Sequence, residues 1–305
     1  MRRPFPTDAR LTAIALAYRN PDIALIADLV LPRTAADAEF KWLEYDLAQG
    51  FTLPDTKVGR RSKPNEVEFS ATEHIDKVDD YGLDDIVPNE DIDDDNQGVD
   101  PLGTAAGYLS GLLSLGREQR VASLVFNTAN HTNNTTLASG SRWDDDGIDP
   151  VESIGDALDT PIMRPNLAVF GQTTWTKLRR NAFIVKAIKG QLASGQVSRQ
   201  EFAEYFELQD VYVGAGFVNT AKKGQAAALS RVWGKHAAFI YRDRTAGPQA
   251  GVTYGFTAVK GAKTSGQIPE PTIGLSGAVR VRTGERLKEL VCAKDLSYYF
   301  QTAVN

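Results

Sequence analysis

Apolar and small residues recur at spacings of three and four between residues 98 and 129, the longest such pattern in the chain. Asp100 and Pro101 stand at its start, where an N-cap residue and a proline without an N–H both favour a first helical turn. The pattern predicts one helix, roughly 40 Å long, with an apolar stripe along one side. Such a helix is either an ordinary core helix or the spine of the fold. The stripe comprises Leu102, Ala105, Ala106, Leu109, Leu112, Leu113, Val121, Leu124 and Val125.

Three glycines, Gly103, Gly107 and Gly111, repeat every four residues within this pattern. Glycines at that spacing give a helix a smooth face, against which the backbone of a neighbouring strand can pack closely. The uncharged run around them is shorter than the roughly 20 residues needed to span a bilayer. We therefore expect the helix to pack within protein, and we expect no membrane partner.

The chain before this helix divides into two patterns. Residues 1–48 read as an N-terminal arm of short helices, because Asn20 and Pro21 form a helix start and apolar residues follow at helical spacing. The arm ends in an aromatic cluster, for which core packing is favoured over a ligand site. The apolar residues are Ile23, Ile26, Leu29 and Val30, and the aromatic ones are Phe40, Trp42 and Tyr45.

Residues 51–73 predict a long β-hairpin, because a Gly/Ser/Pro/Asn turn signal at 59–65 separates two extended runs. Few apolar side chains line either run, and a two-stranded ribbon with so little to bury is marginal alone. It therefore either folds back on its own domain or lies on another subunit. Its tip is basic and its exit is acidic. The residues are Lys57, Arg60, Arg61 and Lys63 at the tip, and Glu66 and Glu68 at the exit.

Acidic residues dominate positions 76–95, and a calcium loop is the sharpest interpretation of such a run. The run fails the EF-hand template, because Asn96 stands where glycine is required and Leu102 stands where the bidentate glutamate is required. A solvated acidic loop, or a surface that meets a basic partner, is favoured over a loose divalent-ion site, which stays an alternative. The residues considered for that surface are Asp79, Asp80, Asp84, Asp85, Asp93, Asp94 and Asp95.

The pattern of apolar and polar residues changes twice in the second half of the chain. Residues 149–241 alternate helical and strand patterns, with capping boxes at Asp149 and Ser198, and predict helices packed on a small sheet. From Ala237 onward the patterns are mostly β, and Val279 to Arg282 alternates apolar and basic residues. Together the two halves predict an α+β fold.

Composition and charge restrict the function. The chain has 305 residues and a net charge of −5, so no general basic field attracts nucleic acid, and any DNA contact should be weak and non-specific. A single cysteine, Cys292, excludes an intrachain disulfide framework and a cysteine-based zinc site. The pattern around it favours a buried, inert thiol.

Candidate catalytic chemistry is sparse. His74, His131 and His236 lie in unrelated segments, and no nucleophile elbow, zinc-binding helix or phosphate-binding loop occurs. The strand at 211–213 runs into Gly214 and Gly216, but Asn219 stands where a dinucleotide-binding turn needs its third glycine. A plain turn is favoured there, and a nucleotide-dependent enzyme remains a remote alternative. We assign no catalytic, cofactor-binding or metal residue.

The order of these elements resembles the major capsid proteins of tailed bacteriophages, which have the Hong Kong 97 fold. The resemblance rests on the hairpin FTLPDTKVGRRSKPNEVEFSAT before the helix GVDPLGTAAGYLSGLLSLGREQRVASLVFNTA, and on the ending GAVRVRTGERLKELVCAKDLSYYFQTAV. It covers nearly the whole chain. The absence of a catalytic constellation is what a shell protein would show.

The resemblance implies four regions. Residues 1–48 are the N-terminal arm, and 49–80 are an extended loop, the E-loop, that reaches over a neighbouring subunit. Residues 81–148 and 242–292 form the peripheral (P) domain with the spine helix 98–129. Residues 149–241 form the axial (A) domain, to which 293–305 returns.

The resemblance also implies partners and a location. Copies of the chain would form pentamers and hexamers of an icosahedral shell, which encloses double-stranded DNA and contacts it non-specifically. Portal and scaffolding proteins, and a decoration or cement protein, are the other implied partners. The location would be the virion, and the host cytoplasm during assembly. An encapsulin-like cellular compartment is the alternative within the same fold, and the contents of purified particles would distinguish the two.

Overall fold

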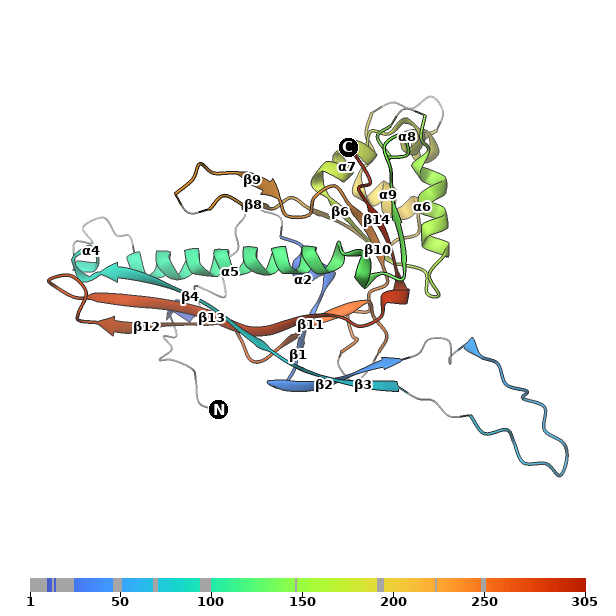
Figure 1. The fold of residues 1–305 in the computed structure, drawn as a ribbon, viewed down its shortest axis with the longest axis horizontal. Coiled ribbons are helices and arrows are strands. Elements are labelled where there is room, and N and C mark those ends of the chain that lie inside the picture. The colour runs from blue at the N-terminus through green and yellow to red at the C-terminus, as the bar shows by residue number, and fades with distance from the viewer. Residues whose placement is uncertain are drawn as a thin grey trace.

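A long helix, α5 (Pro101–Val125), lies along a twisted sheet, with a second lobe at one end and an extended loop projecting past the sheet (Figure 1). Asp100 has the extended backbone of an N-cap, and Pro101 occupies the first helical turn, as the sequence predicts. The computed structural model describes residues 10–12, 14, 25–45, 51–67, 71–93, 100–145, 147–190, 195–222, 224–247 and 251–305.

The sheet beneath α5, here called the long sheet, is built around one strand, β13 (Ala278–Val291). One edge of β13 pairs with β4, and the other edge pairs with β12 and then β11, all antiparallel. Strand β1 adds to β11 in parallel. The bounds are β1 Arg33–Ala35, β4 Asp79–Pro88, β11 Gly255–Val259 and β12 Thr264–Glu270, and the helix α4, Asn89–Asp93, follows β4.

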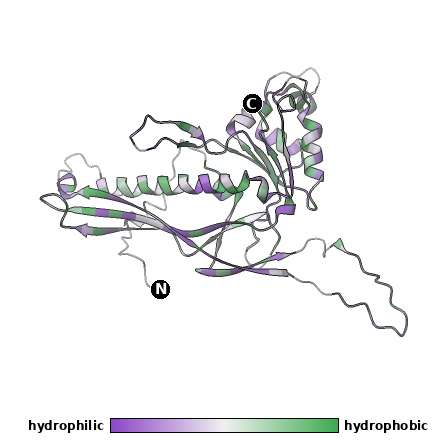
Figure 2. Cartoon of the chain, viewed as in Figure 1, coloured by the Kyte–Doolittle hydropathy of each residue, from purple (hydrophilic) through white to green (hydrophobic). Residues whose placement is uncertain are grey.

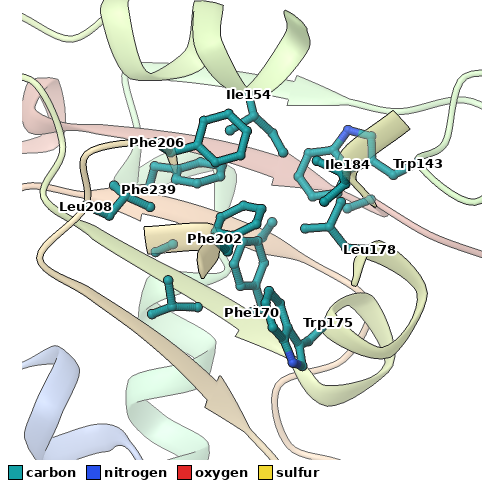
Figure 3. Packing of buried hydrophobic residues seen from close by; sticks show 14 of the residues in the cluster. Trp143, Ile154, Phe170, Trp175, Leu178, Ile184, Phe202, Phe206, Leu208 and Phe239 are labelled. Carbon is teal, nitrogen blue, oxygen red and sulfur yellow. The ribbon is translucent and has the colours of Figure 1, made fainter. Parts of the chain in front are cut away.

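The second lobe contains a compact sheet of order β5-β14-β10-β6-β7. Helices cover one face of it, and Phe170, Phe202, Phe239 and Trp175 pack together there (Figure 3). The bounds are β5 Asn133–Thr136, β6 Leu167–Gly171, β7 Asp210–Gly214, β10 Ala237–Ile240, β14 Ser297–Gln301, α6 Pro150–Asp159, α7 Gln172–Leu178, α8 Ala182–Lys189 and α9 Arg199–Tyr205.

The other face of the compact sheet packs on the C-terminal half of α5. Val121 and Val125 of the helix share a buried cluster with Val169 and Ile240 of the sheet. The short helix α2 (Ala27–Val30) joins the same cluster. The spine therefore has two different partners along its length: the long sheet under its first half and the compact sheet under its second.

The prediction of an arm made of short helices is wrong for residues 33–45. That stretch forms β1 and then β2 (Glu39–Tyr45), which pairs antiparallel with β3 (Ala71–Lys77). Phe40 and Trp42 are two residues apart, so on a strand they share one face, and both pack in one buried cluster with β11 and β13. The core role predicted for these two aromatic rings is therefore correct, although the element is a strand. The predicted helix start at Asn20 and Pro21 lies outside the described residues.

The prediction of a hairpin at 51–73 is also wrong in its position, because the paired strands lie outside most of that range. Strands β2 and β3 form the ladder, whereas 52–59 and 63–67 form no regular strand. A second, smaller ribbon consists of β8 (Phe217–Asn219) and β9 (Leu229–Arg231), which pair with each other.

The stripe along α5 is only partly buried. Figure 2 shows hydrophobic residues on more than one side of the helix. Leu109, Leu113 and Val121 are buried, but Leu112 is exposed together with Tyr108. A Cβ on Gly103 would meet Asp100 and Ile14 rather than a strand of the long sheet, which corrects the expectation for that glycine. Among the described helices, none is long and apolar enough to cross a membrane.

Candidate subunit-contact surfaces

Residues 51–67 form an extended loop that projects from the β2–β3 ladder away from the rest of the molecule (Figure 1). Every residue in this loop is exposed. A tight turn closes its tip, where the N–H of Ser62 donates to the carbonyl of Gly59 at 3.0 Å. Across the loop, the side-chain amide of Asn65 donates to the carbonyl of Asp55 at 2.7 Å. These two local bonds help to shape the tip of the loop.

The predicted basic residues all lie on this loop and are exposed. Within the described residues, no ion pair joins any of them to an acid of the same chain. Glu66 is exposed on the returning arm, and Glu68 lies outside the described residues. The basic residues are Lys57, Arg60, Arg61 and Lys63.

The loop also carries exposed apolar side chains, to which the sequence analysis assigned no contact role. Leu53 is 86% exposed, and Phe51, Val58 and Val67 are exposed as well. Large apolar side chains that are exposed on a projecting loop are candidates for a contact with another molecule.

The acidic run on β4 is largely neutralised within the chain. Asp84 bonds to Arg282 at 2.6 Å and to Arg280 at 3.2 Å. Asp80 pairs with Arg286 at 2.8 Å, and Asp79 with Lys288 at 3.2 Å. Hydrogen bonds from Arg282 hold the pKa of Asp84 below its ordinary value.

The register of β4 against β13 explains this pairing. Asp84 lies directly opposite Arg282, and Asp80 opposite Arg286, and facing residues of opposite charge stabilise an antiparallel ladder. Sequence reasoning found both charge runs but not their pairing. Asp85 and Asp93 are exposed, and Asp94 and Asp95 lie outside the described residues. The acidic surface for a basic partner therefore stays a prediction. Asp79, Asp80 and Asp84 already form ion pairs with basic residues of the same chain.

Two buried charged residues of α5, Arg117 and Glu118, hold the N-terminal segment. The carboxylate of Glu118 accepts from the N–H groups of Ile26 at 2.9 Å and Ala27 at 2.8 Å, which begin α2. It also accepts from the indole N–H of Trp233 at 2.5 Å. The pKa of Glu118 is raised, because burial disfavours its charged form. The three hydrogen bonds oppose this shift only in part.

Arg117 points into the long sheet. It donates to the carbonyl of Leu31 at 3.2 Å and to the hydroxyl of Thr257 at 2.9 Å, and it pairs with Asp28. Burial lowers the pKa of Arg117, and the carboxylate of Asp28 opposes that shift. A sequence signal existed, because Arg117 stands four residues from both Leu113 and Val121 and so continues the buried stripe.

The turn at 211–224 does not form a nucleotide site. Gly214 and Gly216 lead from β7 into strand β8, whereas phosphate binding of the dinucleotide type needs a helix N-terminus there. Gly214 has a packing role instead, because a Cβ at this position would overlap the ring of Trp233.

Two of the histidines come together, although their segments are far apart in sequence. The rings of His131 and His236 both lie against Tyr299, with centroid distances of 5.1 and 5.8 Å. His131 also faces the hydroxyl of Ser297 at 2.7 Å, but both residues are buried and no substrate could reach them. Burial lowers the pKa of His131 to about 4, so the ring is neutral and structural.

The other candidate groups have structural surroundings too. His74 stacks on Trp42 and bonds to Glu44 at 2.7 Å. Burial raises the pKa of Cys292 to about 12, as an inert thiol requires. Among the described residues, no group of three or more His, Cys, Asp and Glu side chains could hold a metal ion.

Comparison with known proteins agrees with this geometry. The chain is 49% identical over 305 residues to the major capsid protein of Pseudomonas phage JBD67, across 99% of this chain and 98% of that protein. No family model matches the sequence.

Solved structures show the fold. A phage-related protein of Bordetella bronchiseptica RB50 superposes with a TM-score of 0.75 at 17% identity, over 99% of each chain. The capsid structure of cyanophage P-SCSP1u gives 0.57 at 10% identity, over 92% of this chain and 88% of that one. The chain therefore belongs to the major capsid proteins of tailed bacteriophages and has their Hong Kong 97-type fold.

Proposed function

We propose that the chain is the repeating subunit of an icosahedral shell, and that it assembles through pentamers and hexamers. The observation that carries the proposal is the projecting loop at 51–67, which is exposed throughout and includes large apolar side chains. An extended loop that is exposed throughout buries little apolar surface in its own subunit. A neighbouring copy supplies the missing surface.

The four regions named from the resemblance are proposed as the working parts of this subunit. The proposed E-loop is 49–80, with the projecting loop as its tip and the β2–β3 ladder as its root. The long sheet and α5 support the P domain at 81–148 and 242–292. The compact sheet supports the A domain at 149–241. The pairing of β14 with β10 supports the assignment of 293–305 to the A domain.

In this proposal the E-loop of one copy lies on the next copy, with Lys57, Arg60, Arg61 and Lys63 near acidic groups of that neighbour. Asp85 and Asp93 suit that role best among the described acids of the run, because Asp79, Asp80 and Asp84 already have partners. Each exposed ion pair contributes only about 0–1 kcal/mol. Repetition over a shell makes their sum important and sensitive to salt.

The shell in this proposal encloses double-stranded DNA, which it contacts without sequence preference, since the net charge of the chain is −5. Portal and scaffolding proteins, and a decoration or cement protein, are proposed partners. The proposed location is the virion, after assembly in the host cytoplasm. Membership of the phage capsid family supports these assignments and favours packaged DNA over protein cargo.

Reversal of the tip charge tests the proposal. We expect Arg60→Glu combined with Arg61→Glu to abolish closed shells while the subunit stays folded, because both side chains are exposed and touch no core. Sedimentation velocity and negative-stain microscopy measure assembly, and the melting temperature measures folding.

A matched control reverses two exposed basic residues of the A domain, Lys186→Glu and Arg199→Glu, with the same change in net charge. This control should still assemble. Normal shells from the Arg60/Arg61 double variant would refute the role of the tip, and a wild-type chain that forms no particles would refute the shell itself.

A further inference from the structure

The ribbon β8–β9 is a second projecting element with exposed apolar side chains. It leaves the compact sheet at Gly214, projects from the second lobe, and returns at Trp233 (Figure 1). Phe217 is 42% exposed and Leu229 is 68% exposed. Within the described residues, β8 and β9 pair only with each other. Such a ribbon gains stability when it packs on something else.

Several contacts within the ribbon hold its described residues together. The side-chain oxygen of Asn219 accepts from the N–H groups of Ala221 at 3.1 Å and Ala228 at 3.0 Å, which fixes the path of the tip. The guanidinium of Arg231 lies 3.8 Å from the centre of the Phe217 ring. At the base, Trp233 is buried and its indole N–H donates to Glu118 of α5. A binding element that is already in shape loses little conformational entropy on binding.

The charge of the ribbon has one sign. Every charged residue between Val211 and Tyr241 is basic, and Lys222 is exposed near the tip. The ribbon therefore presents apolar side chains flanked by positive charge. Its partner should present apolar surface flanked by negative charge.

The outer face of α6 has that complementary character. Glu152 and Asp156 are exposed one helical turn apart, and Ile162, just beyond the helix, is an exposed large apolar residue. Helix α6 lies on one flank of the second lobe, and the ribbon leaves from the opposite flank (Figure 1). Complementary patches on opposite flanks of one subunit produce head-to-tail contacts, which close into rings when the rotation closes.

We propose that the β8–β9 ribbon of each copy docks on helix α6 of the adjacent copy, as a contact within the pentamer and hexamer rings. Phe217 and Leu229 pack toward Ile162, and Lys222 pairs with Glu152 and Asp156. This inference rests on the proposed shell function, and it assigns to the A domain a ring contact separate from the E-loop.

A charge-reversal cycle tests the pairing in the full-length chain. Lys222→Glu and Asp156→Lys each place like charges in contact at every interface of a ring, so each should lower the fraction of subunits in rings and shells by about tenfold or more. The double variant restores opposite charges and should recover most of the wild-type assembly. Sedimentation velocity gives the assembled fraction, and the melting temperature of unassembled subunits shows that each variant folds.

Glu204→Lys is the matched control, because Glu204 is exposed on α9 of the same lobe but not on α6. Combined with Lys222→Glu, it restores the same net charge and should fail to restore assembly. Rescue by Glu204→Lys as strong as that by Asp156→Lys would overturn the pairing, as would normal assembly of both single variants. Lys222→Glu particles that assemble normally but retain less DNA would also overturn it, in favour of a DNA contact. In each of these cases the Arg60/Arg61 test still decides the shell function independently.

Discussion

At the scale of single residues, His131 shows how a buried side chain makes stability depend on pH. It is 3% exposed, and its Nε2–H donates to the carbonyl of Val125 at 2.6 Å. The rings of Tyr254 and Tyr299 stack against it. Burial lowers the pKa of His131 to about 4, from about 6.5 in an unfolded chain.

Stability should therefore fall as the pH drops from about 6.5 to about 4. In that range the unfolded chain binds a proton at His131 that the folded chain excludes, which favours unfolding. The full loss from this residue is about 3 kcal/mol. Urea unfolding of wild type and His131→Phe across this range measures the effect, and the variant should lose less stability with acid. Parallel pH profiles for the two proteins would disprove the assignment.

The burial of two charged residues on α5 could not be predicted from the sequence. Arg117 and Glu118 look like solvated charges in the middle of a helix, yet both are buried. Some of their partners lie about 90 positions earlier in the chain, in the segment around Ile26. Others, Trp233 and Thr257, lie 115 and 140 positions later. No local pattern contains that information, although the position of Arg117 within the apolar stripe was a usable hint.

At the scale of elements, the carboxylate of Glu118 is one of two buried charged groups that attach α2 to α5, and the guanidinium of Arg117 is the other. Replacement of Glu118 by leucine leaves the N–H groups of Ile26 and Ala27 and the indole of Trp233 without their acceptor. Each unsatisfied buried donor costs about 1–3 kcal/mol, so Glu118→Leu should lower the free energy of unfolding by about 3 kcal/mol or more.

Gln119→Leu is the matched control, because the neighbouring side chain is exposed and should change stability by less than about 0.5 kcal/mol. Chemical denaturation of the unassembled subunit measures both variants. Equal stabilities for the two would show that Glu118 does not hold the segment.

Elements with a strong local period were predictable, and elements defined by a distant partner were not. The spacing predicted a helix over 98–129, and α5 spans Pro101–Val125. The capping box predicted at Ser198 is present at the start of α9. In contrast, β2 was read as part of a helical arm, because only its pairing with β3 and its packing on Phe256 and Leu290 make the strand evident.

At the scale of the whole molecule, we expect substitutions at the exposed apolar residues of the projecting loop to affect shell assembly without affecting the folding of the subunit. Leu53 contacts so little of its own subunit that Leu53→Asp should leave the melting temperature of the subunit unchanged. On a neighbour, a charge in a dehydrated contact would be unfavourable, so shells should fail to form. Electron microscopy and a thermal melt of the same preparation test both halves of this prediction.

Leu53→Met is the conservative control and should still assemble, because it keeps the side chain apolar and of similar size. Normal shells from Leu53→Asp would place this part of the loop outside any contact. A large fall in melting temperature would instead place Leu53 in the core of its own subunit, against its exposure.

The central place of β13 has a consequence for the timing of synthesis. Its partner β4 is encoded far upstream, since Arg280 and Asp84 are 196 positions apart, and β14 near the C-terminus completes the compact sheet. The long sheet cannot close until β13 has left the ribosome, nor the compact sheet until β14 has, and contacts of such long range form slowly. A partly made chain thus exposes its projecting loop but offers no finished surface to receive one. Premature joining of nascent copies is disfavoured, and only completed subunits become competent to build a shell.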